Sequence, residues 1–309
     1  DIDMGGDFNR TVVTMVGEPE SVLQTVTECT SIALELIDMR LHSGEHARMG
    51  AVDVVPFIPI KGVTMEECIN LSNRYAKLVS DEHSLPVFLY ANSARYPSRV
   101  RLPDIRKGEY EGLQEKIQSP DWKPDFGPAK FQPTMGATAT GARNFLIAYN
   151  VNLNTADKSK ANTIASKIRT SGIVVKDDKG ETVRDKNGIV QRIPGIFEKL
   201  QAAGWMYNEE IAQVSMNLLD YSVTGLHDVT EAIKLEASKL GLEAVAGELV
   251  GLVPLQAIMD AGNHYSDTNI QDVDSLVENA IEGLMLDRLE SFDPYENIIE
   301  WAIEREKNE

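Results

Sequence analysis

Cysteine is nearly absent from this sequence of 309 residues, which contains only Cys29 and Cys68. Two cysteines cannot form the disulfide framework of a small secreted protein, and they are too few to build a zinc site by themselves. Each falls at an apolar position of a predicted helix, so we expect both thiols to be buried. The sequence also lacks HExxH and CxxC motifs, and we therefore predict no metal site.

Positive charge is scarce as well, because 30 Lys and Arg residues face 48 Asp and Glu residues, for a net charge of −18. A surface this acidic repels phosphate groups, which argues against nucleic acid and anionic membranes as main partners. There is no run of 18 apolar residues and no signal-peptide pattern, so we expect a cytoplasmic protein without membrane contact. Residues 271–309 hold 12 of the acids and only three bases, in a pattern typical of amphipathic helices with a solvated acidic face.

The first half of the sequence alternates strands and helices. Short β-branched or apolar runs predict strands at residues 11–16, 51–60 and 85–90. Helical periodicity follows the first two of these strands, and Thr64 and Glu67 form a capping box before the second helix. The sequence starts at Asp1 without a Met, in what we expect to be the tail of a strand that begins upstream.

A long segment rich in Pro, Gly and charge, residues 91–142, follows these strands, with two short helices predicted at 102–106 and 109–117. Long segments of this kind inside a compact protein are usually functional or disordered. Aromatic residues spread along the segment favour an ordered one.

The second half predicts the element order β-α-β-β-α-β. The expected strands are residues 145–153, 196–202, 212–219 and 244–252, and the expected helices are 156–171 and 226–240. This order is that of the ferredoxin-like split unit, an antiparallel sheet backed by two helices. Two glycine-containing turns within residues 173–192 predict a flexible hairpin-like insertion.

The predicted fold class is therefore α+β, with two ferredoxin-like α/β sandwich subdomains built on antiparallel sheets. The first 90 residues are consistent with the same unit as the second half. We place the boundaries at 1–143, with a truncated start, and 144–309, which includes the acidic helical tail.

His46 is the most interesting of the five histidines. It lies in the loop Gly44-Glu45-His46-Ala47-Arg48-Met49-Gly50, between a predicted helix and a predicted central strand. Glu45 and Arg48 beside it are able to keep the pKa of the imidazole close to neutral pH, as general acid–base catalysis requires. The alternative is an exposed loop histidine without a role, because most loop residues are not catalytic.

Two further segments have functional potential. Residues 95–107 contain five bases and one acid, which suits either binding of carboxylates or ion pairs with the protein's own acids. Residues 127–143 contain three glycines and several small hydroxyl residues, which suits close approach to a flat ligand or an anion. That second segment matches neither the P-loop nor the GxGxxG pattern.

Together these segments resemble the formiminotransferase family. The resemblance covers almost the whole chain, and its longest stretch runs from Gly44 to Pro59. The other stretches are Asn9-Arg10-Thr11-Val12-Val13-Thr14, Leu36-Ile37-Asp38-Met39, Gly108-Glu109-Tyr110-Glu111, Pro124-Asp125-Phe126-Gly127-Pro128, Gly136-Ala137-Thr138-Ala139-Thr140-Gly141-Ala142-Arg143 and Gly247-Glu248-Leu249-Val250-Gly251-Leu252-Val253-Pro254.

The resemblance implies transfer of a formimino group from N-formimino-L-glutamate to tetrahydrofolate as co-substrate, a late step of histidine degradation, in a tunnel between two ferredoxin-like subdomains. It implies that His46 is catalytic and that Asp3 orients its imidazole. It also implies a homodimer and, for a chain without a cyclodeaminase domain, a separate downstream cyclodeaminase. The implied folate-binding residues are Gly127, Pro128, Ala129, Lys130, Phe131, Gln132, Pro133, Thr134, Met135 and Gly136.

Both substrates of this reaction carry carboxylates, so Arg10, Arg48 and Arg143 are candidate anchors. Ala47 stands where family members often have Pro, and Met135 stands where some relatives have Trp. Two alternatives stay open: transfer of a formyl group between 5-formyltetrahydrofolate and glutamate, as a folate salvage route, and a non-catalytic folate-binding protein.

Overall fold

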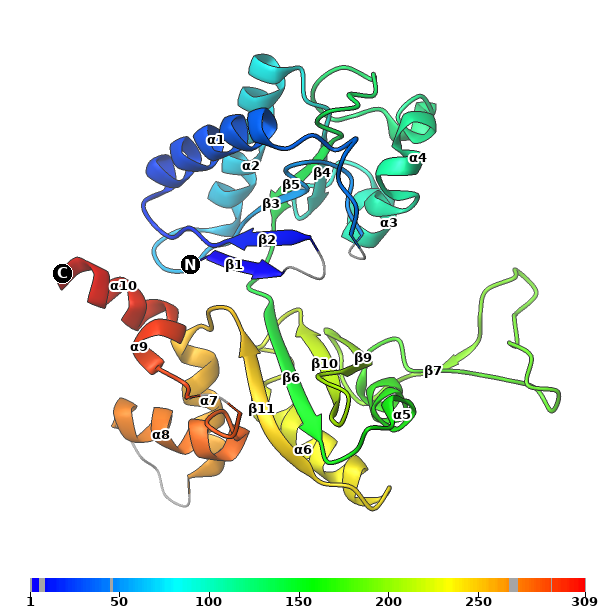
Figure 1. The fold of residues 1–309 in the computed structure, drawn as a ribbon, viewed down its shortest axis with the longest axis vertical. Coiled ribbons are helices and arrows are strands. Elements are labelled where there is room, and N and C mark those ends of the chain that lie inside the picture. Colours follow the sequence, from blue (N-terminus) through cyan, green and yellow to red (C-terminus); the bar gives the residue numbers. More distant parts are fainter. Residues whose placement is uncertain (1, 6–8, 45–46, 267–271, 290, 309) are drawn as a thin grey trace. The chain divides into compact units, whose positions relative to one another are not determined.

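The computed structural model describes residues 2–5, 9–44, 47–266, 272–289 and 291–308. It is a mixed α and β structure, as predicted, with antiparallel sheets and one parallel sheet (Figure 1). The chain divides into two compact units, unit 1 from Asp1 to Asn144 and unit 2 from Phe145 to Glu309. Within the described ranges, every helix is too short or too polar to cross a bilayer.

Unit 1 is built on a parallel sheet, which corrects the prediction of an antiparallel ferredoxin-like sheet for this half. Strands β3 (Val54–Phe57), β5 (Thr138–Ala142) and β4 (Val87–Ala91) lie in the order β3-β5-β4, with β5 parallel to both neighbours. Strands β1 (Ile2–Gly5) and β2 (Arg10–Val13) form a separate antiparallel pair.

The central strand β5 is the element that the sequence analysis missed, and its small residues explain why. Its sequence is Thr-Ala-Thr-Gly-Ala, and all five residues are buried. A Cβ on Gly141 would lie 2.2 Å from the carbonyl oxygen of Tyr90, so only glycine allows this approach to β4. Long connections bring β4 and β5 into parallel register, whereas a short hairpin would have made them antiparallel.

Helices cover both faces of this sheet. Helices α1 (Pro19–Leu36) and α2 (Met65–His83) pack on one face, over a core that includes Tyr75 and Leu89. Helices α3 (Leu102–Arg106) and α4 (Glu109–Lys116), with the 3-10 turns η1 (Pro97–Arg99) and η2 (Pro120–Trp122), cover the other face, over a core that includes Phe88 and Ile105. Both short helices lie where the sequence predicted them.

The predictions for the start of α2 and for Cys68 are confirmed, whereas the prediction for Cys29 is wrong. The capping box of α2 is present, with the Thr64 hydroxyl accepting from the Glu67 N–H and the Glu67 carboxylate accepting from the Thr64 N–H. Cys68 is buried as expected, but Cys29 is exposed. The prediction for Cys29 was wrong because the helical period places it on the outer side of α1.

Unit 2 has the predicted order β-α-β-β-α-β. Strands β6 (Ile147–Leu153), β9 (Leu200–Met206), β10 (Ala212–Leu218) and β11 (Ala244–Val250) form a sheet in the order β11-β6-β10-β9, with antiparallel neighbours. Helices α5 (Lys158–Ile168) and α6 (Leu226–Ser238) pack against the apolar face of this sheet.

The acidic tail is helical and amphipathic, as predicted. Helix α7 (Leu255–Tyr265) packs against α8 (Val273–Leu284), followed by α9 (Pro294–Asn297) and α10 (Ile299–Asn308). Leu276, Val277 and Leu284 of α8 are buried in the core of unit 2.

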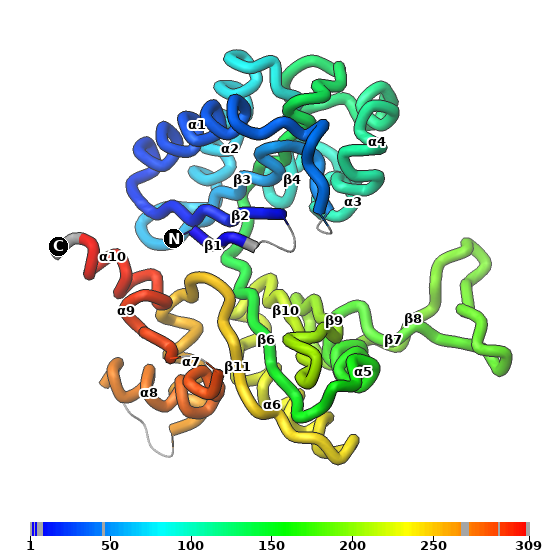
Figure 2. Tube along the Cα trace, in the orientation of Figure 1, coloured from blue at the N-terminus to red at the C-terminus, as the bar shows by residue number. Residues whose placement is uncertain are grey.

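The insertion in unit 2 is an arm that extends from the sheet, as Figure 2 shows. It contains the short strands β7 (Ile173–Val174) and β8 (Arg192–Ile193). Its two turns have the same construction, with the Asp177 carboxylate accepting from the N–H groups two and four residues later, and Asp185 doing the same.

Candidate functional site

All of the predicted site residues belong to unit 1. His46, the predicted catalytic residue, lies outside the described residues. Asp3 is a residue of β1, where it pairs with Val12, but its side chain is not among those the structure describes. The geometry of the site is therefore built from the residues that follow His46 and from the segment 127–136.

These two segments are direct neighbours, although more than 80 residues separate them in the sequence. The Ala51 N–H donates to the carbonyl of Met135 at 2.9 Å, and the Ala137 N–H donates to the carbonyl of Met49 at 3.2 Å. Gly50 and Gly136 form an antiparallel bridge between these two hydrogen bonds. The structure thus brings the end of the His46 loop against the end of the predicted folate-binding segment.

Glycine is required on both sides of this bridge. A Cβ on Gly50 would lie 2.4 Å from the carbonyl oxygen of Ala137, and one on Gly136 would lie 2.1 Å from that of Met49. Gly136 also has a φ of +73°, a conformation that residues with a side chain rarely adopt. The glycines therefore serve close backbone contact between the two segments.

The carbonyl groups at the end of segment 127–136 are held by other parts of unit 1. The Tyr110 hydroxyl donates to the carbonyl of Pro133 at 2.5 Å, and the Met39 N–H donates to that of Thr134 at 2.9 Å. Tyr110 also contacts Phe131, with 5.4 Å between ring centroids. The sequence analysis gave Tyr110 no role, and only its place in the Gly108-Glu109-Tyr110-Glu111 stretch singled it out.

The middle of the same segment presents free donors. In the part of the chain that the structure describes, the backbone N–H groups of Ala129, Lys130 and Phe131 donate to no other group, and the Lys130 side chain is exposed. Backbone N–H groups next to a cation favour carboxylate or phosphate oxygens. The segment therefore has donors of the kind that an anionic group needs, and its binding of such a group stays a prediction.

The three candidate arginine anchors differ in their surroundings. Arg48 is held by the carboxylates of Glu109 and Glu111, at 3.1 and 2.6 Å, and its side chain is 13% exposed. Hydrogen bonding to Arg48 holds the pKa of Glu111 below its ordinary value. Arg143 donates to the carbonyl of Asn144, and Arg10 is an exposed residue of β2. The geometry around Arg48 favours a structural role over an anchor for substrate.

Both units match models of one protein family. The model of the formiminotransferase domain, N-terminal subdomain, matches residues 1–143, and that of the formiminotransferase domain matches residues 148–304. The chain belongs to the formiminotransferase family.

Relatives agree with this assignment. A formimidoyltransferase-cyclodeaminase of Rattus norvegicus is 45% identical over 98% of this chain and 54% of its own length. Two proteins named glutamate formimidoyltransferase match over most of both chains. The one from Streptococcus pyogenes is 38% identical over 92% of this chain and 88% of its own, and the one from Thermoplasma acidophilum is 37% identical over 91% and 86%. The chain spans about half the length of the cyclodeaminase-containing relatives.

The basic stretch of this formiminotransferase-family chain is used internally. Arg99 pairs with Asp125 at 2.7 Å, Arg106 pairs with Asp53, and Arg101 lies 3.9 Å from Asp104. Of the two interpretations of residues 95–107, ion pairing with the protein's own acids is therefore the one that the structure supports.

Asp53 is a residue that the sequence analysis passed over, although it lies inside the longest stretch of resemblance. Its carboxylate accepts from the Met49 N–H at 2.7 Å and from the Arg106 guanidinium. The signal that could have identified Asp53 is an acidic residue at the start of an otherwise apolar strand.

The histidines outside the His46 loop have structural surroundings. His83 shares a hydrogen bond of 2.7 Å with Ser31, which ties α2 to α1. His227 stacks on His264 in unit 2, with 4.7 Å between ring centroids, and burial lowers the pKa of His227. Among the described residues, no three His, Cys, Asp or Glu side chains are grouped as metal ligands would be.

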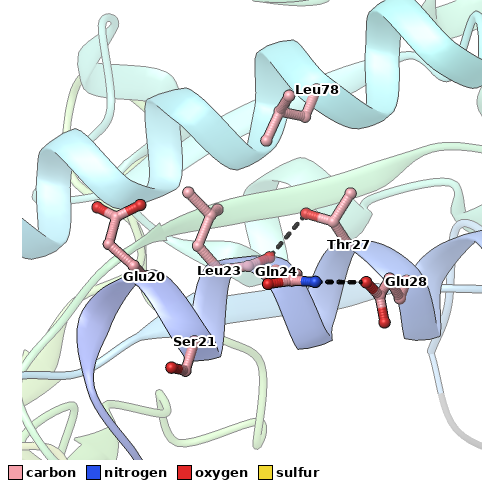
Figure 3. A pocket seen from close by; sticks show the side chains of 7 residues that line it. All are labelled: Glu20, Ser21, Leu23, Gln24, Thr27, Glu28 and Leu78. Carbon is pink, nitrogen blue, oxygen red and sulfur yellow. Dashed lines mark hydrogen bonds between the residues drawn. The ribbon is translucent and has the colours of Figure 1, made fainter.

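One surface pocket in unit 1 lies between α1 and α2 (Figure 3). It is lined by Glu20, Ser21, Leu23, Gln24, Thr27, Glu28 and Leu78. Thr27 and Gln24 already bond within α1, to the Leu23 carbonyl and the Glu28 carboxylate. The pocket includes none of the predicted site residues.

Proposed function

We propose that this chain transfers a formimino group from N-formimino-L-glutamate to tetrahydrofolate, giving 5-formiminotetrahydrofolate and glutamate. The observation that carries the proposal is the pairing of residues 49–51 with residues 135–137, which joins the His46 loop to the segment assigned to folate. Membership of the formiminotransferase family and the relatives named glutamate formimidoyltransferase support it.

The chemistry moves one proton from N5 to the leaving amine and needs no redox step. N5 of tetrahydrofolate attacks the formimino carbon, and the tetrahedral intermediate collapses as the C–N bond to glutamate breaks. His46 takes the proton from N5 and gives it to the departing amine, a contribution of roughly 10²- to 10⁴-fold in rate. Asp3 is proposed to orient the imidazole through its second nitrogen. Binding both substrates in one site raises the rate further, because the reacting groups are held close together in the right orientation.

Segment 127–136 is proposed to bind the folate. The N–H groups of residues 129–131 and the exposed Lys130 suit a glutamyl carboxylate, and polyglutamyl forms of folate offer several. The contact between Tyr110 and Phe131 offers aromatic surface to a flat ring. Arg10 and Arg143 remain proposed anchors for the second set of carboxylates, whereas Arg48 is already neutralised by Glu109 and Glu111.

Several finer assignments are part of the same proposal. Unit 2 is classed as ferredoxin-like on its strand order β11-β6-β10-β9. We assign residues 1–143 and 144–309 to the two halves of a formiminotransferase, with a boundary one residue before that between units 1 and 2. The protein is proposed to act as a cytoplasmic homodimer whose product is consumed by a cyclodeaminase.

Product analysis tests this function. The purified protein is incubated with formiminoglutamate and tetrahydrofolate, and the folate product is identified by mass spectrometry. We expect 5-formiminotetrahydrofolate and glutamate in equal amounts. A parallel reaction of 5-formyltetrahydrofolate with glutamate tests formyl transfer, and a folate titration without turnover tests a pure binding role. Turnover only in the formyl reaction, or binding without any turnover, would contradict the proposal.

A further inference from the structure

The Asp53 carboxylate links helix α3 to the backbone that follows the His46 loop. Its Oδ1 accepts from the Met49 N–H at 2.7 Å, and its Oδ2 accepts from the Arg106 guanidinium. The side chains of Asp53 and Arg106 are only 20% and 18% exposed. Both carboxylate oxygens are occupied by protein donors, so the structure uses Asp53 to hold two segments together.

The arginine end of this link is itself firmly fixed. Ile105, next to Arg106, is fully buried in the core under α3. The ammonium of Lys116 donates to the carbonyls of Asp104, Ile105 and Lys107, which closes the C-terminal end of α3. The backbone that carries Arg106 is therefore fixed, and with it the position of the guanidinium that binds Asp53.

The other end of the link reaches the folate segment. Met49 is 1% exposed, and its carbonyl accepts from the Ala137 N–H, while the Ala51 N–H donates to Met135. Gly50 and Gly136 touch between these bonds with no room for a Cβ on either side. A shift of Met49 must therefore move Gly136 as well, because close-packed backbones transmit displacement rather than absorb it.

We propose that Asp53 is a positioning residue for folate binding, which with Arg106 fixes residues 49–51 as the support for segment 127–136. This inference rests on the proposed function and deepens it, since it assigns Asp53 and Arg106 an effect on the folate site. Asp53 does not touch the folate and takes no proton in the reaction. Its effect is exerted through the backbone of Met49 and Gly136.

Three variants separate the two hydrogen bonds of Asp53. Asp53→Ala removes both, whereas Asp53→Asn keeps an oxygen for the Met49 N–H and turns an amide donor towards Arg106. In Asp53→Asn two donors face each other, the new amide and the Arg106 guanidinium. Adding Arg106→Met removes the guanidinium, so the Asp53→Asn/Arg106→Met double variant no longer has this unfavourable contact. Glu20→Gln is the matched control, because it breaks the Arg74–Glu20 ion pair between α1 and α2 in the same unit.

Folate affinity is the main measurement, made by titration with 5-formyltetrahydrofolate as a stable probe at a temperature where every variant is folded. We expect Asp53→Ala to raise the Kd roughly tenfold, the order expected for loss of a charge-assisted hydrogen bond. Asp53→Asn should show a smaller increase, which the added Arg106→Met should reduce. Glu20→Gln should leave the Kd within about twofold of wild type, as exposed ion pairs contribute little.

Steady-state kinetics distinguish positioning from general loss of stability. We expect the KM for tetrahydrofolate to rise in Asp53→Ala and Asp53→Asn, with the KM for formiminoglutamate nearly unchanged. Variants that fold and keep wild-type folate affinity would overturn the inference, and so would equal increases in both KM values. If Asp53→Ala does not fold, Asp53→Asn and the Asp53→Asn/Arg106→Met double variant decide the question.

The outcome is separable from that of the proposed function. If wild-type protein binds folate and turns over formiminoglutamate while the variants match it, only the role of Asp53 fails. If wild-type protein does not bind folate, the proposed function and this inference both fail.

Discussion

The guanidinium of Arg99 and the carboxylate of Asp125 form a buried ion pair, with 2.7 Å between Nη1 and Oδ2 and exposures of 2% and 1%. Arg99 also donates to the carbonyls of Asp121 and Lys123, and Asp125 accepts from the Leu89 N–H. Asp125 comes just before segment 127–136, so this pair anchors the start of the proposed folate segment to strand β4.

Loss of Arg99 should therefore be severely destabilising. Removing one partner of a buried pair leaves the other charge uncompensated, and we expect Arg99→Met to lower the stability of unit 1 by about 3–5 kcal/mol. Trp122 is the only tryptophan of unit 1, so urea unfolding followed by fluorescence in a Trp205→Phe/Trp301→Phe background reports on this unit. Arg95, 4.0 Å from Asp125 and half exposed, is the control, and Arg95→Met should cost about 0–1 kcal/mol. Equal losses in the two variants would show that burial of the pair is not what matters.

Gly136→Ala should disturb the site more than an alanine at another glycine of similar backbone conformation. The new Cβ would lie 2.1 Å from the carbonyl oxygen of Met49. Gly62 is the control position, because it has a φ of +70° and nothing lies within 4 Å of an added methyl group. Gly62→Ala therefore measures only the cost of placing alanine in a left-handed backbone conformation, roughly 1–2 kcal/mol. We expect Gly136→Ala to lose more stability than Gly62→Ala and to weaken folate binding, measured by thermal unfolding and ligand titration. Similar effects of both variants would argue against close contact at Gly136.

Turnover should depend on His46. We expect His46→Ala to abolish formimino transfer while folate binding stays largely intact, because the imidazole is proposed to move a proton rather than to hold the ligand. Initial rates and folate titrations on the same preparation test this, with His83→Ala as the control, since His83 bonds to Ser31 between α1 and α2. Wild-type turnover by the His46 variant would end its assignment as the catalytic residue.

Acid should destabilise unit 2 through His227. Burial lowers the pKa of this imidazole below its ordinary value of 6.5, with His264 adding to the effect and Asp228, Asp260 and Glu231 opposing it. The unfolded chain then binds a proton more readily than the folded one. The stabilising contribution of neutral His227 is therefore complete above about pH 6.5 and is lost as the pH falls through the lowered pKa of the folded protein.

The variant His227→Phe keeps a ring against His264 but cannot titrate. We expect wild-type protein to lose stability more steeply than this variant between pH 7 and pH 5, as measured by chemical unfolding of unit 2. Parallel pH profiles for the two proteins would remove His227 from the explanation.

Patterns that depend on side-chain period or on local chemistry were readable from the sequence. The β-α-β-β-α-β order of unit 2, the short helices α3 and α4 and the Thr64 capping box each rest on contacts within a few residues or on alternating burial. The two glycine loops that the structure pairs were singled out from the sequence by their resemblance to the formiminotransferase family, and their role in a site stays a prediction.

Features set by distant contacts were not readable in this way. Strand β5 is made of Thr, Ala and Gly, and it becomes a central strand only because β3 and β4 lie on both sides of it. Asp53 and Tyr110 take their roles from partners more than 20 residues away, Arg106 and Pro133. The basic stretch at residues 95–107 was ambiguous for the same reason, since its ion-pair partner Asp125 is known only from the fold.

The most direct test of the central claim is the fate of the formimino group. Formiminoglutamate labelled with ¹³C at its formimino carbon is incubated with tetrahydrofolate and the wild-type chain, and the label is followed by NMR. The account predicts that the label moves to N5 of the folate as free glutamate appears in equal amount. Label that stays on glutamate, in a protein that is folded and supplied with both substrates, would contradict it.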